Sequence, residues 1–147
     1  MGVGKNAELV IEPGAELGPS RWLELTQERI DAFADATEDR QSIHIDPELA
    51  SKGPFGTTVA HGFLTLSLVI PLWNDVFQHD GISVNYGLNR LRFPAAVPAG
   101  SRIRARFEVD SVDEVAGGCQ AAIGVTVERE GEEKPALVAE LLLRLLN

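Results

Sequence analysis

The segment GFLTLSLVIPLW, residues 62–73, decides the fold of this chain. Its apolar residues are distributed all round a helical projection, whereas a helix at a protein surface carries them on one stripe. Its polar members, Thr65 and Ser67, are small enough to hydrogen-bond back to the helix backbone. The segment therefore predicts a helix that the rest of the chain encloses on every side. Pro71 is expected to end or kink this helix.

Strand patterns dominate the sequence that follows this helix. Residues 101–110 alternate strictly between apolar and charged side chains, and residues 121–127 repeat the alternation. Residues 83–93 predict a third strand. The tail, residues 135–146, contains Leu, Ala and Glu, which also favour helix, but a fourth antiparallel strand would complete the sheet. One uniformly apolar helix with a run of antiparallel strands predicts an α+β fold in which the sheet wraps around the helix.

The sequence before this helix predicts shorter helices. Residues 27–37 carry apolar side chains on one face, and Thr26 is a suitable N-cap for them. The polar residues 38–42 predict a loop. Asp46 followed by proline is a good start for a short helix that runs to Ala50.

Length and composition limit the function classes. A chain of 147 residues fits a single domain, residues 1–147, in which residues 1–13 are expected to be mobile. A net charge of −9 disfavours nonspecific binding to nucleic acid or anionic membranes, and no apolar run is long enough to cross a bilayer. The single cysteine, Cys119, excludes an internal disulfide framework and suits a reducing cytoplasm. The three histidines and Cys119 have no zinc-type spacing.

Arginine is concentrated in one part of this acidic chain. Between Gly81 and Phe107 there is no Asp or Glu, but five arginines fall there: Arg90, Arg92, Arg102, Arg104 and Arg106. One interpretation is a cationic site for an anionic small ligand. The other is that these arginines form the solvated face of two strands.

Asp39 and His44 are the first candidates for chemistry. They lie five residues apart in a polar stretch after a predicted helix, so both side chains can reach one small molecule. Acid/base catalysis needs two groups with separable pKa values, and a carboxylate near an imidazole supplies them. The plainer interpretation is a surface loop in which Asp46 caps the next helix.

A second candidate lies where the apolar helix begins. Gly62 opens this helix, and the N-terminus of a helix presents free backbone N–H groups and the positive end of its dipole. Glycine lets a ligand approach the backbone closely. A thioester carbonyl placed on the Gly62 N–H would have its developing enolate oxygen stabilised. For His61 the plainer interpretation is a hydrogen-bonded polar residue at the helix end.

Residues 29–44, RIDAFADATEDRQSIH, are similar to the hydratase 2 motif of MaoC-like dehydratases and (R)-specific enoyl-CoA hydratases. That motif reads Gly-Asp-x-Asn-Pro-[Leu/Ile/Val]-His, and its spacing places the family's catalytic aspartate on Asp39 and its histidine on His44. Residues 60–64 resemble the start of the family's central helix, and residues 85–94 resemble the strand that follows it. The resemblance covers roughly residues 22–106. The NodN-like, single-domain subgroup is the most similar.

Three residues depart from the motif. The family's glycine, asparagine and proline are here Glu38, Gln41 and Ser42. Glu38 removes backbone freedom before Asp39 and adds a second carboxylate. Gln41 keeps an amide on a longer arm, and Ser42 relaxes the φ restraint of proline. None of the three changes removes an acid or a base.

The resemblance implies a hot-dog fold, in which an antiparallel sheet wraps around a long central helix. It also implies a homodimer, or an oligomer built from dimers, with active sites near the subunit interface. The implied substrate is an enoyl-CoA or an acyl-carrier-protein thioester in fatty acid metabolism. The implied reaction is its reversible hydration to a (R)-3-hydroxyacyl thioester.

The resemblance also implies roles for single residues. Asp39 and His44 form the acid/base pair and hold one water between them, with Gln41 orienting the water or Asp39. The expected oxyanion and substrate contacts are Gly62, Gln41, His61 and Asn85. The candidate contacts to the phosphates of CoA are Arg90, Arg92 and Arg104. No metal or redox cofactor is expected.

Two alternatives stay open at this point. A hot-dog thioesterase would use a carboxylate near the same helix to activate water against the thioester carbonyl carbon. A non-catalytic module would bind acyl thioesters, with Glu38, Gln41 and Ser42 marking a decayed site.

Overall fold

The computed structural model describes residues 11–147. The segment expected to be mobile, residues 1–13, therefore lies mostly outside the described residues. Ile11, which belongs to the described part of that segment, is buried in the core. The helices are α1 (Gln27–Thr37), α2 (Ser42–Ile45), α3 (Pro47–Ser51) and α4 (Gly62–Val76). The strands are β1 (Glu16–Leu17), β2 (Leu23–Leu25), β3 (Ile82–Arg92), β4 (Ser101–Val115), β5 (Gly118–Arg129) and β6 (Leu137–Leu146).

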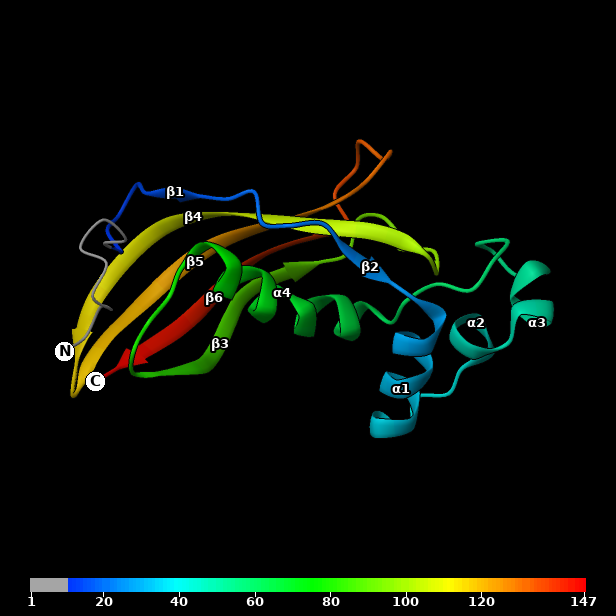
Figure 1. The fold of residues 1–147 in the computed structure, drawn as a ribbon, viewed down its shortest axis with the longest axis horizontal. Coiled ribbons are helices and arrows are strands. Elements are labelled where there is room, and N and C mark those ends of the chain that lie inside the picture. The colour runs from blue at the N-terminus through cyan, green and yellow to red at the C-terminus, as the bar shows by residue number, and fades with distance from the viewer. Residues whose placement is uncertain (1–10) are drawn as a thin grey trace.

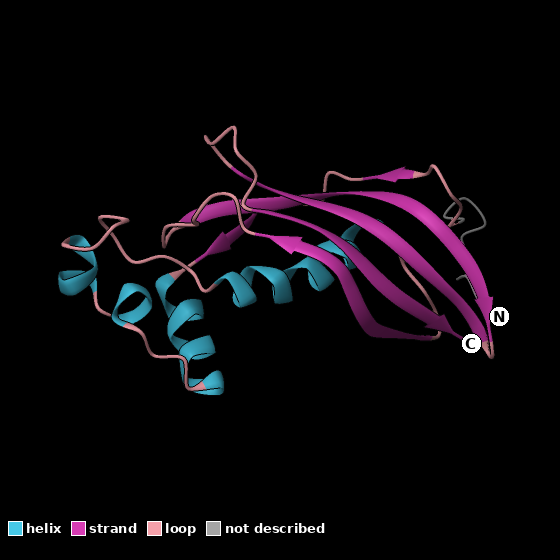
Figure 2. Ribbon diagram, turned by 180° about the vertical axis from the view of Figure 1, so that it is seen from behind, coloured by secondary structure: helices cyan, strands magenta, loops and turns pink. Residues whose placement is uncertain are grey.

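The strands form one antiparallel sheet that curves around α4. Its order is β1-β4-β5-β6-β3, and β2 also pairs with β4. Figures 1 and 2 show the long strands bending over α4, while α1, α2 and α3 lie at one end of the sheet. The predicted α+β class and the hot-dog arrangement are therefore confirmed. Among the described residues, no helix is long and apolar enough to cross a membrane.

The core lies between α4 and the concave face of the sheet. Leu72 and Trp73 of α4 are almost fully buried, and the Trp73 ring packs edge-on against Phe107 of β4 at 5.1 Å between centroids. The other face of α4 is open, because Phe63 is 64% exposed and Ser67 is exposed. The prediction that the chain encloses this helix on every side is therefore wrong.

Pro71 does not end α4, so the first of the two predicted effects is wrong and the second, a kink, stays a prediction. The helix continues to Val76 with Pro71 inside it. A proline in a helix interior costs about 3 kcal/mol. Burial of Leu72 and Trp73 in the following turn offsets this cost, since each buried large apolar side chain contributes about 1.5–3 kcal/mol.

The predicted strands are confirmed, with changes at their ends. The tail is a strand, β6, because its alternate leucines Leu141, Leu143 and Leu145 enter the core. β4 continues five residues beyond the predicted end, to Val115, through a shift in register between Val109 and Ser111. β1 and β2 were not predicted, since two or three residues are too few to show a period.

The region before α4 follows its capping signals. α1 spans the predicted residues 27–37, and the Thr26 hydroxyl accepts a hydrogen bond from the Arg29 N–H. Asp46 caps α3 as predicted, accepting from the Leu49 N–H. The predicted loop is shorter than expected, because Ser42 already begins α2 and His44 therefore lies in a helical turn.

Candidate active site

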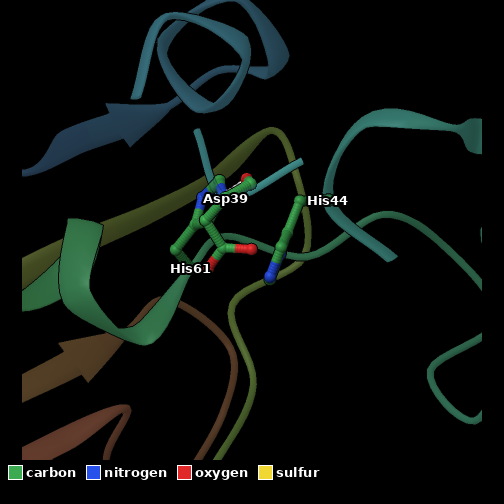
Figure 3. A group of neighbouring side chains, drawn as sticks. All are labelled: Asp39, His44 and His61. Atoms are coloured by element: carbon green, nitrogen blue, oxygen red, sulfur yellow. Dashed lines mark hydrogen bonds between the residues drawn. The ribbon is translucent and has the colours of Figure 1, made fainter. Parts of the chain in front are cut away.

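Asp39, His44 and His61 meet at the N-terminal end of α4. One side-chain nitrogen or oxygen from each lies within 4.8 Å of the others (Figure 3). Asp39 is exposed in the turn between α1 and α2, and His44 lies on α2. His61 occupies the N-cap position of α4. The structure thus brings together the predicted acid/base pair and one predicted substrate contact.

The tautomer of His44 follows from its surroundings. Its side chain is buried, and Nδ1 lies 2.7 Å from the Val59 carbonyl oxygen. A carbonyl only accepts hydrogen bonds, so Nδ1 carries a proton, and in the neutral imidazole the lone pair is then on Nε2. The Val59 N–H also donates to the Ile43 carbonyl at 2.9 Å, which ties this segment to α2. A neutral imidazole with Nε2 unprotonated is the form that a general base requires.

His61 contacts both of the other two residues. Its Nε2 donates to the backbone carbonyl of Asp39 at 2.9 Å, while its Nδ1 is buried without a partner among the described residues. The ring stacks on His44, with centroids 3.8 Å apart and planes 23° apart. Phe33 packs against it from α1 at 4.9 Å. The bond to Asp39 agrees with the plainer interpretation of His61 as a hydrogen-bonded polar residue at the helix end.

Two imidazoles and a carboxylate are also a donor set that suits zinc. A metal ion binds in the plane of an imidazole ring, along the nitrogen lone pair. Because His44 and His61 are stacked almost parallel, an ion in the plane of one ring lies well out of the plane of the other. The lone pairs of the two rings are therefore not aimed at one shared metal ion.

Gly62 gives the site its backbone donor. α4 has no side-chain cap, so no side chain occupies the N–H groups of its first turn. The ring of Phe93 lies over Gly62, and a Cβ atom added at this glycine would meet it at 3.0 Å. Only glycine fits here without a shift of Phe93. The approach of a ligand to the Gly62 N–H stays a prediction.

Gln41 and Asn85 occupy different parts of the molecule. Gln41 precedes α2 and its backbone carbonyl accepts from the His44 N–H at 3.0 Å, so it adjoins the site. Asn85 lies on β3 and lines a pocket between α4 and the sheet. That pocket, about 560 Å³ in volume, is otherwise lined mainly by apolar side chains of α4, β3, β5 and β6, including Leu66, Ile70, Leu88, Leu137 and Leu141.

The predicted phosphate contacts lie on the sheet face opposite α4. Arg104 alternates with the core residues of β4 and so faces away from α4. Arg90 and Arg92 pair in register with Glu140 and Val138 of β6, between the residues that face α4. All three arginines therefore project from the sheet face opposite the helix. Their contact with CoA phosphates stays a prediction.

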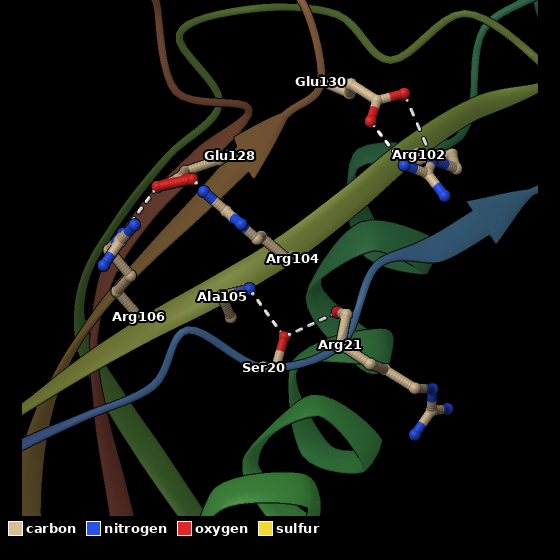
Figure 4. A network of polar contacts seen from close by, with 8 residues as sticks. All are labelled: Ser20, Arg21, Arg102, Arg104, Ala105, Arg106, Glu128 and Glu130. Carbon is tan, nitrogen blue, oxygen red and sulfur yellow. Dashed lines mark hydrogen bonds and ion pairs between the residues drawn. The ribbon is translucent and has the colours of Figure 1, made fainter.

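The arginines of β4 have protein partners. Arg104 and Arg106 both bind Glu128 of β5, at 2.9 and 2.6 Å, and Arg102 pairs with Glu130 (Figure 4). The side chain of Trp22 covers the Arg104 guanidinium, 4.2 Å from the ring centroid. These pairs agree with the interpretation of a solvated strand face.

Two residues near the site were not identified in the sequence. Phe33 belongs to the apolar face of α1, and that pattern predicts a core residue and not a contact with His61. Val59 acts through its backbone carbonyl, which every residue possesses, so no side-chain signal was available.

Comparison with known proteins agrees with this arrangement. The family model described as MaoC like domain matches residues 8–130. The chain is 49% identical over 141 residues to 3-hydroxyacyl-thioester dehydratase Z of Mycobacterium tuberculosis (strain H37Rv), covering 94% of this chain and 93% of that protein. It is 45% identical over 131 residues to nodulation protein N of Rhizobium leguminosarum bv. viciae, covering 86% and 81%.

Among solved structures, the (R)-hydratase from A. caviae involved in PHA biosynthesis superposes with a TM-score of 0.77 at 25% sequence identity. The match covers 91% of this chain and 96% of that structure. The family match, residues 8–130, includes the central helix and the segment that carries Asp39 and His44.

Proposed function

The chain is an enzyme of the MaoC-like hydratase/dehydratase family, and we propose that it reversibly adds water to a trans-2-enoyl thioester. The product is the (R)-3-hydroxyacyl thioester. The observation that carries the proposal is the convergence of Asp39, a His44 tautomer with a free Nε2, and the open backbone donors of α4. CoA or acyl-carrier protein would present the acyl group.

In the proposed mechanism one water lies between Asp39 and His44. His44 Nε2 accepts a proton from this water as its oxygen bonds to Cβ of the substrate. The proton that leaves this water is passed on to Cα on the same face with the help of Asp39, so that one water is added overall and the addition is syn. Gln41 orients the water or Asp39. These steps need only an acid and a base, and we propose that no metal or redox cofactor takes part.

The start of α4 stabilises the charge that develops on the substrate. As the hydroxyl adds to Cβ, negative charge moves to the thioester oxygen, which becomes an enolate. The Gly62 N–H points out of the uncapped helix end, where the dipole also favours negative charge. Removing one such donor in other enzymes costs about 10²–10³ in rate.

An apolar pocket is available for the acyl chain of the substrate. The pocket between α4 and the sheet includes Leu66 and Ile70, one and two turns along the helix from Gly62. At 1.5 Å per residue, Ile70 is about 12 Å from Gly62 along the axis. We propose that the chain extends from the thioester along this side of α4, with Asn85 beside it.

We also propose that the enzyme is a homodimer, or an oligomer built from dimers. β3 is an edge strand of eleven residues. Of the large apolar side chains exposed within residues 11–147, several lie on this strand or on the open face of α4: Phe63, Ile82, Val84, Tyr86 and Leu88. A second copy covering this surface would satisfy the open edge and enclose α4.

Substitution of the acid/base pair tests the proposed function. Asp39→Asn and His44→Ala are each expected to lower kcat for hydration of crotonyl-CoA at least about a hundredfold. The fold should survive, because Asp39 is exposed and neither residue belongs to the main core. Asp35→Asn, which removes an exposed carboxylate from the same helical region, is the matched control and should keep full activity. Near-normal hydration by both site variants would refute the assignment.

The same samples separate the two alternatives. A hydratase changes the absorbance of the enoyl group and releases no thiol, whereas a thioesterase releases free CoA that a thiol reagent detects. A non-catalytic module would bind acyl-CoA and hydrate no enoyl-CoA of any chain length.

A further inference from the structure

Gln27, the first residue of α1, uses its side-chain amide to join three segments. Its Nε2 donates to the His44 backbone carbonyl at 2.7 Å and to the Asp31 carboxylate at 2.9 Å. Its Oε1 accepts from the Thr58 hydroxyl at 2.6 Å. Only this amide orientation works, because the reverse would set Oε1 against two other oxygens. A residue that resembles an ordinary helix start is therefore the centre of a hydrogen-bond network.

Thr58 connects this network to the sheet. It is 4% exposed, and its carbonyl accepts from the Ala99 N–H at 3.0 Å, just before β4. The Ala60 N–H donates to the Val97 carbonyl at 2.8 Å in the same place. The segment around Thr58 is thus fixed to the rigid part of the molecule, and Gln27 links that segment to the backbone of α2.

His44 is consequently held at two points. The Val59 carbonyl binds its ring at Nδ1, and Gln27 binds its backbone carbonyl. Thr58 and Val59 are adjacent in the chain, so the two contacts close one loop of hydrogen bonds through His44. A side chain held at both ends has little freedom to turn its Nε2 away from Asp39.

We propose that Gln27 is a positioning residue, which sets the place of His44 through this loop. The inference rests on the proposed function of His44 as the base. Gln27 does not line the acyl pocket, so its loss should affect the chemical step and not substrate binding. Displacement of a reacting group by about 1 Å can cost about a hundredfold in rate.

The test compares variants of the full-length protein in crotonyl-CoA hydration. Gln27→Met keeps the length of the side chain but removes its hydrogen bonds, and should lower kcat about 10–100-fold with KM unchanged within twofold. Gln27→Glu keeps an acceptor for Thr58 but sets a carboxylate against the His44 carbonyl, so it should not restore kcat. Thr58→Val should lower kcat, and Thr58→Ser should keep it. Gln78→Met, at an exposed glutamine after α4, is the control.

A second readout does not depend on activity. In nitrogen-15 NMR of the histidines, the His44 Nδ1 proton should give a slowly exchanging signal in the wild type. This signal should be lost or exchange faster in Gln27→Met and Thr58→Val. If the wild type hydrates no enoyl thioester, the proposed function fails but the NMR comparison still tests Gln27. Wild-type kcat or an unchanged His44 signal in folded Gln27→Met would overturn the proposal, as would a rise in KM at constant kcat.

Discussion

Glu38, which directly precedes Asp39, has a left-handed backbone conformation that is unusual for a residue other than glycine. It ends α1 with φ of 66°, the left-handed conformation that helices usually give to glycine. The family motif has glycine at this position. Glu38 thus adopts a backbone conformation that suits the residue it replaces. The turn delivers Asp39 toward His44, so the protein keeps the geometry at the cost of backbone strain.

Glu38→Gly is expected to stabilise the protein. A non-glycine residue in the left-handed region costs about 1–2 kcal/mol, of which the greater freedom of glycine in the unfolded chain cancels about 0.5–1 kcal/mol. The melting temperature should rise by about 2–4 °C in calorimetry. Glu28→Gly, in the right-handed first turn of the same helix, should lower it. A decrease in both variants would show that Glu38 carries no strain.

The residues of the site differ in how far the sequence revealed them. Asp39 and His44 were identifiable because acid/base chemistry depends on side-chain type and spacing. The hydrogen bonds that orient them use the backbone carbonyls of Val59 and Asp39. Backbone groups are the same at every position, so only the folded chain shows which of them meet a histidine.

At the scale of elements, the pair β4 and β5 carries the main ion-pair group of the sheet. Burial alone would raise the pKa of the Glu128 carboxyl, but hydrogen bonds from Arg106 and Arg104 outweigh it and hold that pKa below its usual value. Two arginines on one strand thus share a carboxylate on the next. Exposed pairs of this kind contribute up to about 1 kcal/mol each.

The stability contribution of Glu128 should depend on pH. Because its pKa is lower in the folded than in the unfolded state, the contribution is present above the unfolded pKa, about 4.3, and is lost as the pH falls through the folded pKa. Wild type should therefore melt above Glu128→Gln at pH 7, and the difference should shrink below about pH 4. Glu133→Gln, at an exposed turn residue, should show no such trend. A difference that grew on acidification would contradict this account.

Periodicity predicted the long elements and failed at their ends. The alternation in β4 revealed the strand but could not show that it continues past the register shift after Val109. Pro71 is a strong local signal against helix, yet burial of its neighbours decides the outcome. Tertiary contacts overrule local preference at both places, and a single sequence contains no direct record of those contacts.

At the scale of the whole molecule, the open face of α4 and the free edge of β3 predict association. Phe63→Lys or Ile82→Lys places a charge on the most exposed apolar side chains of this surface. Each variant should shift the protein from dimer toward monomer in sedimentation or light scattering. Glu133→Lys, which changes charge in the β5–β6 turn, should stay dimeric. Monomeric wild-type protein at micromolar concentration would refute the proposed dimer.

The uniformly apolar sequence of α4 predicted burial correctly for one face of the helix, and the cover of the other face stays a proposal. The chain itself covers the face that carries Leu72 and Trp73, and leaves Phe63 and its neighbours open. An apolar helix face can be buried by its own chain or by a second copy of the chain. Both remove the same apolar surface from water, so the sequence pattern is the same in the two cases.

α2 and α3 stand beyond the end of the sheet, and neither supplies a residue to the main hydrophobic core (Figure 1). A few hydrogen bonds hold the segment that carries His44, so its opening should require less free energy than melting of the sheet. Thermal inactivation is therefore expected to precede global unfolding and to reverse on cooling. Activity measured during a temperature ramp should disappear several degrees before the circular dichroism of the strands changes. The upper working temperature of such an enzyme is set by the segment of α2 and α3 and not by its sheet.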